Sequence, residues 1–331
     1  MSFEIIDLSF DKNSPTNEIS FAATVLEGLS KPEKQLPSWL IFDDKGSEIF
    51  SEIVKLENYH PAICEKNIIH TNRNIITDIV EANPLQLIEL GAGDGEKTLP
   101  LIEHILNIDR RLHYIPIDIS PGAIKNLVSR LKADQKDPSL KVTGVIGDYF
   151  DGLTKFSKNK AQTSLVLYLG LTLGNQDLSE AGIFLKRVSE TLNRGDFMLT
   201  GFDLFSNPKL HYQIYNDPQG LFEKFNLHLL ERINQELGGN FQIENFAQEG
   251  HYNWRTRSVE SYVYSLKDQT VKIEALDKEF FFKQGEGLQT EQSYKFTLDE
   301  IKQLAEDNGF EIVKNLFETN NKFVNTIWRV L

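Results

Sequence analysis

Apolar residues in the middle of the chain follow two alternating patterns, short continuous runs and helical spacings of three and four. The short runs predict buried strands at 85–90, 113–118, 141–146, 164–169 and 197–202. The helical spacings predict helices at 96–107, 121–133 and 178–192. Strands that alternate with helices in this way are typical of an α/β domain with a parallel sheet.

The flanking regions follow other patterns. Apolar positions predict a helix at Gly46–Leu56, and two helical segments are expected around Leu221–Leu237. Alternating runs at 258–265 and 271–276 predict an antiparallel sheet, and the last residues predict a helix followed by strands at 310–318 and 323–331. These changes divide the chain into one domain at 70–203 and 296–331 and a discontinuous second domain at 1–69 and 204–295.

The strand at 85–90 runs directly into glycines at alternate positions, Gly91, Gly93 and Gly95. Glycines let the backbone turn tightly and let a ligand approach the main chain. The next strand ends in Asp118, which is placed to accept the two ribose hydroxyls of a nucleotide. The spacing is G-x-G-x-G with Glu89 inside the strand, which differs from the dinucleotide fingerprint G-x-G-x-x-G. It suits a nucleoside without a pyrophosphate and resembles motif I of class I S-adenosylmethionine (SAM) methyltransferases.

Further candidates follow later strands. In the class I fold an acid such as Asp148 binds the adenine amino group and the next aromatic residue, Tyr149, packs on the ring; a plain turn role for Asp148 is the alternative. The segment Tyr168–Asn175 leaves a strand end, where open sheets bind ligands, and Asn175 offers an amide donor. A role in the turn itself is equally open for Asn175.

Composition excludes several classes of function. The formal net charge of −13 argues against nucleic-acid or anionic-membrane binding, which needs patches of Lys and Arg. The single cysteine, Cys64, excludes an internal disulfide framework and a cysteine zinc site. The seven histidines show no H-x-x-x-H spacing, so we expect no metal. We also expect a cytoplasmic protein, since neither a signal peptide nor an apolar run long enough for a membrane helix is visible.

Seven short motifs in order, between about Leu40 and Leu331, resemble the histidine-specific SAM methyltransferase family. That family includes the L-histidine Nα-methyltransferase of ergothioneine biosynthesis and dimethylallyltryptophan N-methyltransferases. The motifs are Asp43–Phe50, Glu89–Lys97, Tyr114–Ser120, Leu173–Asn175, Tyr215–Gly220 with Phe225-Asn226, Leu230–Gly238 and Thr290–Phe296.

The resemblance implies a role for individual residues. Beside Glu89 and Gly93 of the glycine motif, the SAM positions are Gly91, Lys97, Asp118, Asp148 and Tyr149. Asn175 and Tyr215 match residues that hold the substrate α-carboxylate, and Glu291 with Ser293 match the pair that reads the imidazole of histidine. At a spacing of two, Glu291 and Ser293 also share one face of a strand. Without the resemblance, a solvated polar face would be the favoured interpretation of that pair.

The chain departs from the family pattern at three places. Phe42 stands where the histidine enzyme has Tyr, and Tyr59-His60-Pro61 replaces a common Tyr-Tyr-Pro. The Arg-x-Glu-Met segment beside the side-chain pocket appears as Val259-Glu260-Ser261. Phe42, His60 and Ser261 are therefore candidate substrate residues, and the substrate is expected to be histidine or a tryptophan-like amino acid.

The sequence thus predicts a SAM-dependent N-methyltransferase that acts on the α-amino group of an amino acid with a nitrogen-bearing side chain. Methyl transfer from a sulfonium is an in-line displacement, so we expect positioning residues and no catalytic nucleophile or metal. A class I methyltransferase of another small amine and a non-catalytic SAM-binding protein are the alternatives. The identity of the amino acid, the number of methyl groups, the pathway and the oligomeric state stay open.

Overall fold

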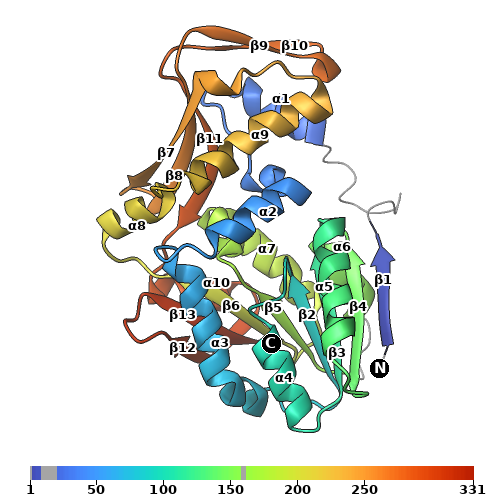
Figure 1. Ribbon diagram of the computed structural model, residues 1–331. Helices are drawn as coiled ribbons and strands as arrows, with labels where there is room; N and C mark the ends of the chain where they lie inside the picture. Colours follow the sequence, from blue (N-terminus) through green and yellow to red (C-terminus); the bar gives the residue numbers. More distant parts are fainter. Residues whose placement is uncertain (1, 9–20, 158–161) are drawn as a thin grey trace. The chain divides into compact units, whose positions relative to one another are not determined.

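Two compact units make up the protein. The computed structural model describes residues 2–8, 21–157 and 162–331 (Figure 1). Described residues within Met1–Asp11, His60–Phe205 and Lys295–Leu331 form the first, which we call unit 1. Those within Lys12–Tyr59 and Ser206–Tyr294 form unit 2. Each unit is therefore assembled from segments that lie far apart in the sequence.

An eight-stranded sheet forms the centre of unit 1, in the order β1-β4-β3-β2-β5-β6-β13-β12. The strands are β1 (Ser2–Asp7), β2 (Leu85–Leu90), β3 (Leu112–Asp118), β4 (Leu140–Ile146), β5 (Ser164–Tyr168), β6 (Phe197–Asp203), β12 (Phe310–Phe317) and β13 (Phe323–Val330). Strands β1 to β6 pair in parallel, whereas β13 is antiparallel to both β6 and β12. The predicted Rossmann-like α/β fold with its C-terminal hairpin is confirmed.

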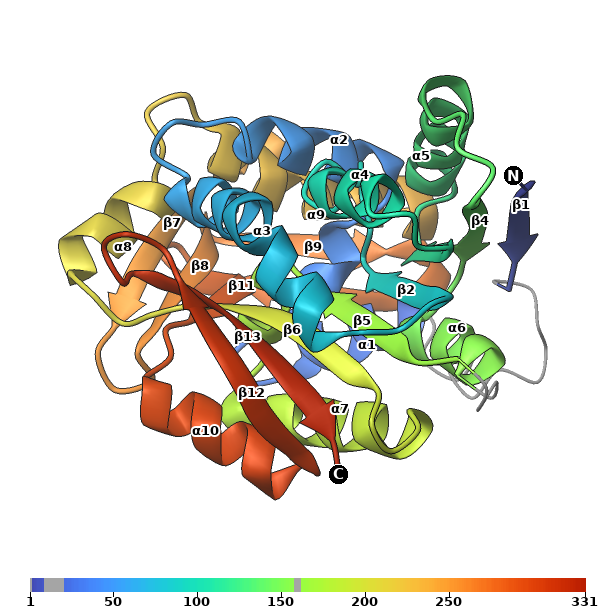
Figure 2. The same ribbon diagram turned by 90° about the horizontal axis from the view of Figure 1, so that it is seen from below.

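Helices cover both faces of this sheet. Figure 2 shows α3 (His60–Ile79), α4 (Leu99–Asn107) and α5 (Pro121–Asp134) on one face and α6 (Tyr149–Phe156), α7 (Leu178–Thr191) and α10 (Leu298–Asp307) on the other. All six residues of β2 are buried as a result, including the polar Gln86 and Glu89, which explains why its apolar residues do not alternate with exposed polar ones. Because β2 to β6 are parallel, their carboxyl ends lie at one edge of the sheet, and the glycine loop after β2 lies at that edge.

Unit 2 is a mixed α+β structure. Its helices are α1 (Phe21–Ser30), α2 (Asp44–Ile53), α8 (Pro208–Tyr215) and α9 (Leu221–Leu237), with short 3-10 turns η2 (Ser38–Ile41), η4 (Ile243–Asn245) and η5 (Glu274–Leu276). A three-stranded antiparallel sheet has the order β11-β8-β7, built from β11 (Gly287–Tyr294), β8 (Ser258–Ser265) and β7 (Phe246–Asn253). A separate hairpin joins β9 (Gln269–Ile273) to β10 (Lys278–Phe282). The long helix α9 buries Phe222, Phe225, Leu229 and Ile233.

Two segments that the sequence had assigned to the second domain belong to unit 1. Strand β1 pairs with β4 and forms one edge of the sheet, and α3 begins at His60, so both lie in unit 1 and not in the second domain predicted at 1–69. The strand has no fully buried residue, because it lies at the sheet edge, and therefore lacks a clear alternating signal. Within the ranges that the structure describes, no helix is long and apolar enough to cross a membrane.

Three predicted elements differ in detail. The helix predicted at 96–107 begins at Leu99, because Gly95 adopts a φ of 68° and the chain is still turning there. The two helical segments expected around Leu221–Leu237 form one helix. The runs at 258–265 and 271–276 lie in different sheets, since β9 pairs with β10 across a short turn, the more local partner.

Candidate active site

The glycine loop leaves the carboxyl end of β2 in unit 1. Gly91, Gly93 and Gly95 have φ angles of 71°, 52° and 68°, a region that L side chains rarely adopt. A Cβ on Gly95 would come within 2.6 Å of Leu127, so this glycine lets the loop pack against α5. A Cβ on Gly93 would meet nothing within 4 Å. The main chain at Gly93 therefore borders open space that a ligand can enter.

Asp118, at the end of β3, is brought to this loop as the sequence predicted. Its Oδ2 accepts the Gly93 N–H at 3.0 Å, and its Oδ1 accepts the N–H of Ser120 at 2.9 Å. These two backbone bonds hold the carboxylate in one orientation at the carboxyl ends of β2 and β3. A fixed carboxylate beside an open glycine backbone suits the ribose of a nucleoside.

Asp148 and Tyr149 lie at the start of α6, after β4. Asp148 caps this helix, since its Oδ1 accepts the Phe150 N–H at 2.8 Å, and burial raises the pKa of its carboxyl. The capping role is the plain alternative that the sequence left open. Tyr149 reaches the glycine loop, because its hydroxyl lies 2.9 Å from the position that a Cβ on Gly91 would take. Its ring meets Tyr168 edge-on with centroids 5.9 Å apart.

Glu89 is buried under the loop with 3% of its surface exposed. The Thr98 hydroxyl donates to one carboxylate oxygen at 2.6 Å, and the Tyr114 hydroxyl donates to the other. Burial raises the pKa of Glu89 to about 7, although both hydroxyls act to lower it. The structure therefore places Glu89 as a support of the loop that follows β2, joined to the segment that leads into α4.

Lys97 lies in the same loop and forms an ion pair with Glu65 of α3, with 2.8 Å between Nζ and Oε2. The same Oε2 accepts the N–H of Gly170 at 2.8 Å. The sequence had not indicated Glu65, since α3 was not predicted. A charged residue beside Cys64, Ile68 and Ile69 on an otherwise apolar helix face was the available signal.

Two of the expected substrate residues lie in unit 1. Asn175 ends the 3-10 turn η3 (Thr172–Asn175), which follows β5 and begins after Leu171 with a φ of 64°. His60 is the first residue of α3. Both side chains are half-buried. Asn175 is thus carried at the carboxyl end of a parallel strand, the edge at which open sheets bind ligands.

The other expected substrate residues lie in unit 2, and three of them meet on β8 and β11. Glu291 pairs directly with Ser261 across the two strands, and the Ser261 hydroxyl donates to Glu291 Oε2 at 3.4 Å. A bulge between Gln289 and Glu291 sets this register. Ser293 follows two residues later, and all three side chains are buried. The interpretation of Glu291 and Ser293 as a solvated polar face is therefore excluded.

Gln248 on β7 is a further polar residue beside this group, and the sequence had not indicated it. Its amide nitrogen lies 3.5 Å from the Ser261 hydroxyl and 3.5 Å from the backbone carbonyl of Tyr215. Tyr215 ends α8, is buried, and packs on Phe222 with ring centroids 5.0 Å apart. Gln248 thus connects Tyr215, one of the two residues expected to hold the α-carboxylate, with Ser261 of the group expected to contact the side chain.

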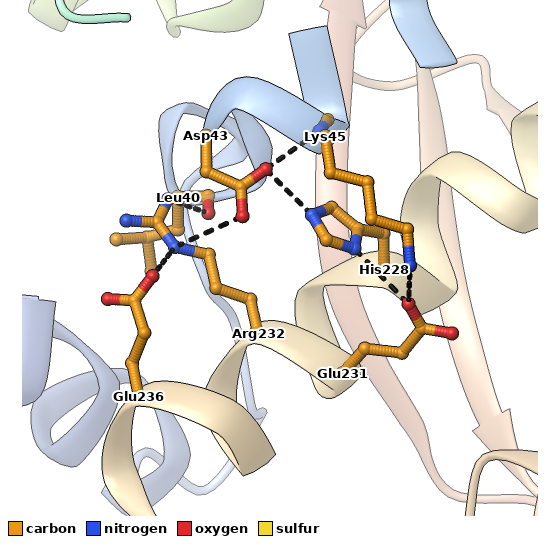
Figure 3. A network of polar contacts seen from close by, with 8 residues as sticks. Leu40, Asp43, Lys45, His228, Glu231, Arg232 and Glu236 are labelled. Atoms are coloured by element: carbon orange, nitrogen blue, oxygen red, sulfur yellow. Dashed lines mark hydrogen bonds and ion pairs between the residues drawn. The ribbon is translucent and has the colours of Figure 1, made fainter. Parts of the chain in front are cut away.

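Phe42 directly precedes Asp43, which belongs to a polar network at the start of α2 (Figure 3). Its ring meets Phe50 and Phe225 edge-on, with centroids 5.3 Å apart in each case. The next residue, Asp43, accepts the Gly46 N–H at 2.7 Å as the helix cap and lies 2.8 Å from Nε2 of the buried His228. Burial acts to raise the pKa of Asp43, but these hydrogen bonds outweigh it and hold the pKa below its usual range.

The network extends along α9. Glu231 lies 3.3 Å from His228 Nδ1 and 2.6 Å from Lys45 Nζ (Figure 3). Arg232 donates to the Leu40 carbonyl at 2.7 Å and pairs with Glu236 at 2.7 Å. These contacts join the segment around Phe42 to α9, beside the aromatic cluster of Phe42, Phe50 and Phe225.

Residues 21–330 match the family described as histidine-specific methyltransferase, SAM-dependent. The chain belongs to this family. It is similar to the histidine N-alpha-methyltransferase of Mycolicibacterium smegmatis, with 31% identity over 277 residues that cover 84% of each protein. An N-methyltransferase of Aspergillus flavus is 25% identical over 97% of this chain and 88% of its own length. The 4-dimethylallyltryptophan N-methyltransferase of Claviceps fusiformis is 24% identical over 188 residues, 56% of this chain and 52% of its own.

Among solved structures, a SAM-dependent methyltransferase from Clostridium acetobutylicum matches with a TM-score of 0.46 and 13% identity, over 87% of this chain and 98% of that one. The family membership makes the chain a SAM-dependent N-methyltransferase. The residues of unit 1 fit this cofactor, since open space at Gly93 adjoins a fixed carboxylate at Asp118. Within the described part of the chain, no group of three or more His, Cys, Asp or Glu residues could hold a metal ion.

Proposed function

We propose that this methyltransferase acts on the α-amino group of an amino acid with a nitrogen-bearing side chain, histidine or a tryptophan-like molecule. The observation that carries the proposal is the buried trio of Ser261, Glu291 and Ser293 on two paired strands of unit 2. A carboxylate and two hydroxyls held on paired strands offer hydrogen-bond acceptors and donors to a polar ring. An imidazole or indole N–H is a donor that such an acid accepts.

Asn175 and Tyr215 are proposed to hold the substrate carboxylate, and His60 and Phe42 to line the side on which the amine lies. SAM supplies an electrophilic methyl group on a sulfonium. The protein's part is to orient the amine lone pair towards it, as the new N–C bond forms while the S–C bond breaks. The ammonium must lose a proton before the attack, and that proton passes to solvent. Asp118, Asp148, Tyr149, Gly91 and Lys97 are the proposed cofactor residues of unit 1.

The side chain at position 261 supports a substrate larger than histidine. Ser261 stands where the family pattern has Met, so its side chain is smaller and adds a hydroxyl. The names of two relatives give different substrates: one is a histidine N-alpha-methyltransferase and the other a 4-dimethylallyltryptophan N-methyltransferase. A larger aromatic substrate is therefore the specific alternative to histidine.

The test is a competition in which histidine, tryptophan and leucine are offered together with labelled SAM. We expect methylation of histidine or tryptophan to exceed that of leucine at least about tenfold, because a site that pairs a ring N–H rejects analogues that lack it. The same assay with Glu291→Gln should narrow this ratio. Preferential methylation of leucine would contradict the proposed role of the trio.

A second comparison tests the carboxylate contacts. The methyl ester of the preferred amino acid should react far more slowly than the free acid, and Tyr215→Phe should reduce the difference. Glu249, an exposed acid on β7, provides the control variant Glu249→Gln, which should leave both ratios unchanged. If the ester reacted as well as the acid, Asn175 and Tyr215 would not hold a carboxylate.

A further inference from the structure

Glu65 is a carboxylate with 1% of its surface exposed, in the first half of α3 in unit 1. Its Oε2 accepts two hydrogen bonds of 2.8 Å, one from the Lys97 ammonium and one from the Gly170 N–H. These partners come from the loop after β2 and from the end of β5. One carboxylate oxygen therefore ties together three segments that are remote in the sequence.

The contact at Gly170 also constrains Lys97. Gly170 has a φ of 82°, and a Cβ there would lie 3.2 Å from Lys97 Nζ. The ammonium is thus held between the carboxylate of Glu65 and the bare main chain at residue 170. An ammonium has three donors. Glu65 takes one of them, and 23% of the Lys97 side chain stays exposed.

The other oxygen, Glu65 Oε1, is buried and has no hydrogen-bond partner within the described residues. It lies against the main chain of β6, where a Cβ on Gly201 would come within 2.2 Å. Gly201 pairs with Asn325 of β13, whose side-chain amide is also buried without a partner in the described part of the chain. A half-satisfied buried carboxylate weakens the fold. Stability alone therefore does not account for a Glu at this position.

The location supplies a reason. Lys97 and Gly170 follow β2 and β5, the two central strands whose carboxyl ends meet where the parallel sheet binds ligands. SAM carries a zwitterionic amino-acid tail beside its nucleoside. An ammonium held in one place, with donors left over, is suited to the carboxylate of that tail.

We propose that Glu65 is a positioning residue of the cofactor site, which holds the Lys97 ammonium against Gly170 where it binds the carboxylate of the SAM amino-acid tail. The inference rests on the proposed cofactor role of Lys97 and adds the residue that sets its place. Glu65 itself acts through Lys97 and does not touch the reacting atoms.

Binding of two nucleosides distinguishes a positioning role of Glu65 from a role in folding alone. S-adenosylhomocysteine carries the amino-acid tail, whereas 5′-methylthioadenosine lacks it. In calorimetric titrations of the full chain, Glu65→Gln should weaken S-adenosylhomocysteine at least about tenfold, the loss expected for one charge-assisted hydrogen bond. Binding of 5′-methylthioadenosine should change by less than about twofold. The glutamine keeps one oxygen that can accept the Gly170 N–H, while it removes the charge and turns the other oxygen into an NH2 group.

Asp196→Asn is the matched control. Asp196 has 3% of its surface exposed and accepts backbone N–H bonds from Ser164 and Asn193. It lies at the amino ends of β5 and β6, away from the carboxyl ends at which the cofactor is proposed to bind. The control variant should leave the ratio of the two affinities unchanged. Equal losses for both nucleosides in Glu65→Gln, or no loss for either, would overturn the proposal.

Lys97→Met separates failure of this inference from failure of the cofactor assignment. It should reproduce the selective loss of S-adenosylhomocysteine, and the double variant should add little to either single one, because the two residues act as a unit. If Lys97→Met has no effect, Lys97 is not a cofactor residue. If Lys97→Met is selective and Glu65→Gln binds S-adenosylhomocysteine normally, Lys97 keeps its role and the inference about Glu65 is wrong. Should Glu65→Gln fail to fold, additivity is tested with Glu65→Asp, which keeps the charge but shortens its reach.

Discussion

At the scale of single residues, the buried carboxyl of Glu89 connects the glycine loop of unit 1 to a titration that can be measured. Glu89 lies in the middle of a buried strand with both oxygens engaged by hydroxyls. Its environment favours the protonated form, and its pKa rises to about 7. The glycine loop of this methyltransferase is therefore supported by a group that titrates near neutral pH.

This shift predicts a pH dependence of stability. In the unfolded chain a Glu titrates near about 4.3. Between that pH and about 7 the folded protein binds the extra proton, so burial of Glu89 lowers stability progressively as the pH rises through this range. Glu89→Gln removes the titration. The melting temperature of the wild type should therefore fall relative to Glu89→Gln between about pH 5 and 8. Parallel curves would show that Glu89 is not shifted.

A second residue prediction concerns Asp118. Asp118→Asn should weaken both S-adenosylhomocysteine and 5′-methylthioadenosine by about 1.5–3 kcal/mol, because both carry the ribose that the carboxylate is proposed to hold. This differs from the tail-selective effect expected at Glu65. The control is Asp134→Asn, at an exposed acid at the end of α5, which should change neither affinity. Unchanged binding in Asp118→Asn would remove this residue from the ribose site.

Sequence reasoning could propose those site residues that follow a local signal. Asp118 ends an apolar strand after a glycine loop, and Glu291 and Ser293 have the spacing of one strand face. Gln248 carries no such signal and Glu65 only the weak one of a charge on an apolar helix face, because the contacts that make them relevant come from residues far away in the sequence. Asp148 has a clear local signal that fits two roles. An acid after a strand can cap the next helix, as Asp148 does, and it can also contact a nucleoside.

At the scale of elements, periodicity predicted the buried strands closely. Strands β2 to β6 start and end within one residue of their expected positions, because helices on both faces keep them uniformly apolar. Periodicity failed to predict an element at the sheet edge, where few residues are buried, and a helix that is interrupted by a kink. The edge strand β1 and the kinked α3, with a non-helical Asn72, were missed for this reason.

The cap of α2 provides an element-scale prediction. Asp43→Ala removes the helix cap and also the partner of Nε2 of the buried His228, so we expect a loss of about 2–3 kcal/mol in the free energy of unfolding. Asp177→Ala removes only the cap of α7, where Asp177 is exposed and forms a capping box with Glu180, and should cost about 1 kcal/mol. Urea unfolding of both variants measures the difference. Equal losses would show that the contact with His228 contributes nothing.

At the scale of the whole molecule, the two units divide the proposed work unequally. Every proposed cofactor residue lies in unit 1. The proposed substrate residues lie in both, with His60 and Asn175 in unit 1 and the others, Phe42, Tyr215, Ser261, Glu291 and Ser293, in unit 2. Cofactor binding should therefore depend on unit 1 alone, whereas amino-acid binding should depend on both units.

Hydrogen exchange tests this division. S-adenosylhomocysteine alone should slow exchange in unit 1 at 91–97, at 147–149 and around Gly170, because their main chain borders the proposed cofactor site. It should leave β11 and the end of α8 in unit 2 unchanged. Addition of the preferred amino acid should then slow exchange at β11, where the bulge before Glu291 interrupts the ladder on an edge strand. Leucine, offered at the same concentration, is the control and should protect β11 less. If S-adenosylhomocysteine alone protected β11 as strongly as the ternary complex does, residues of unit 2 would take part in cofactor binding and the assignment by unit would be wrong.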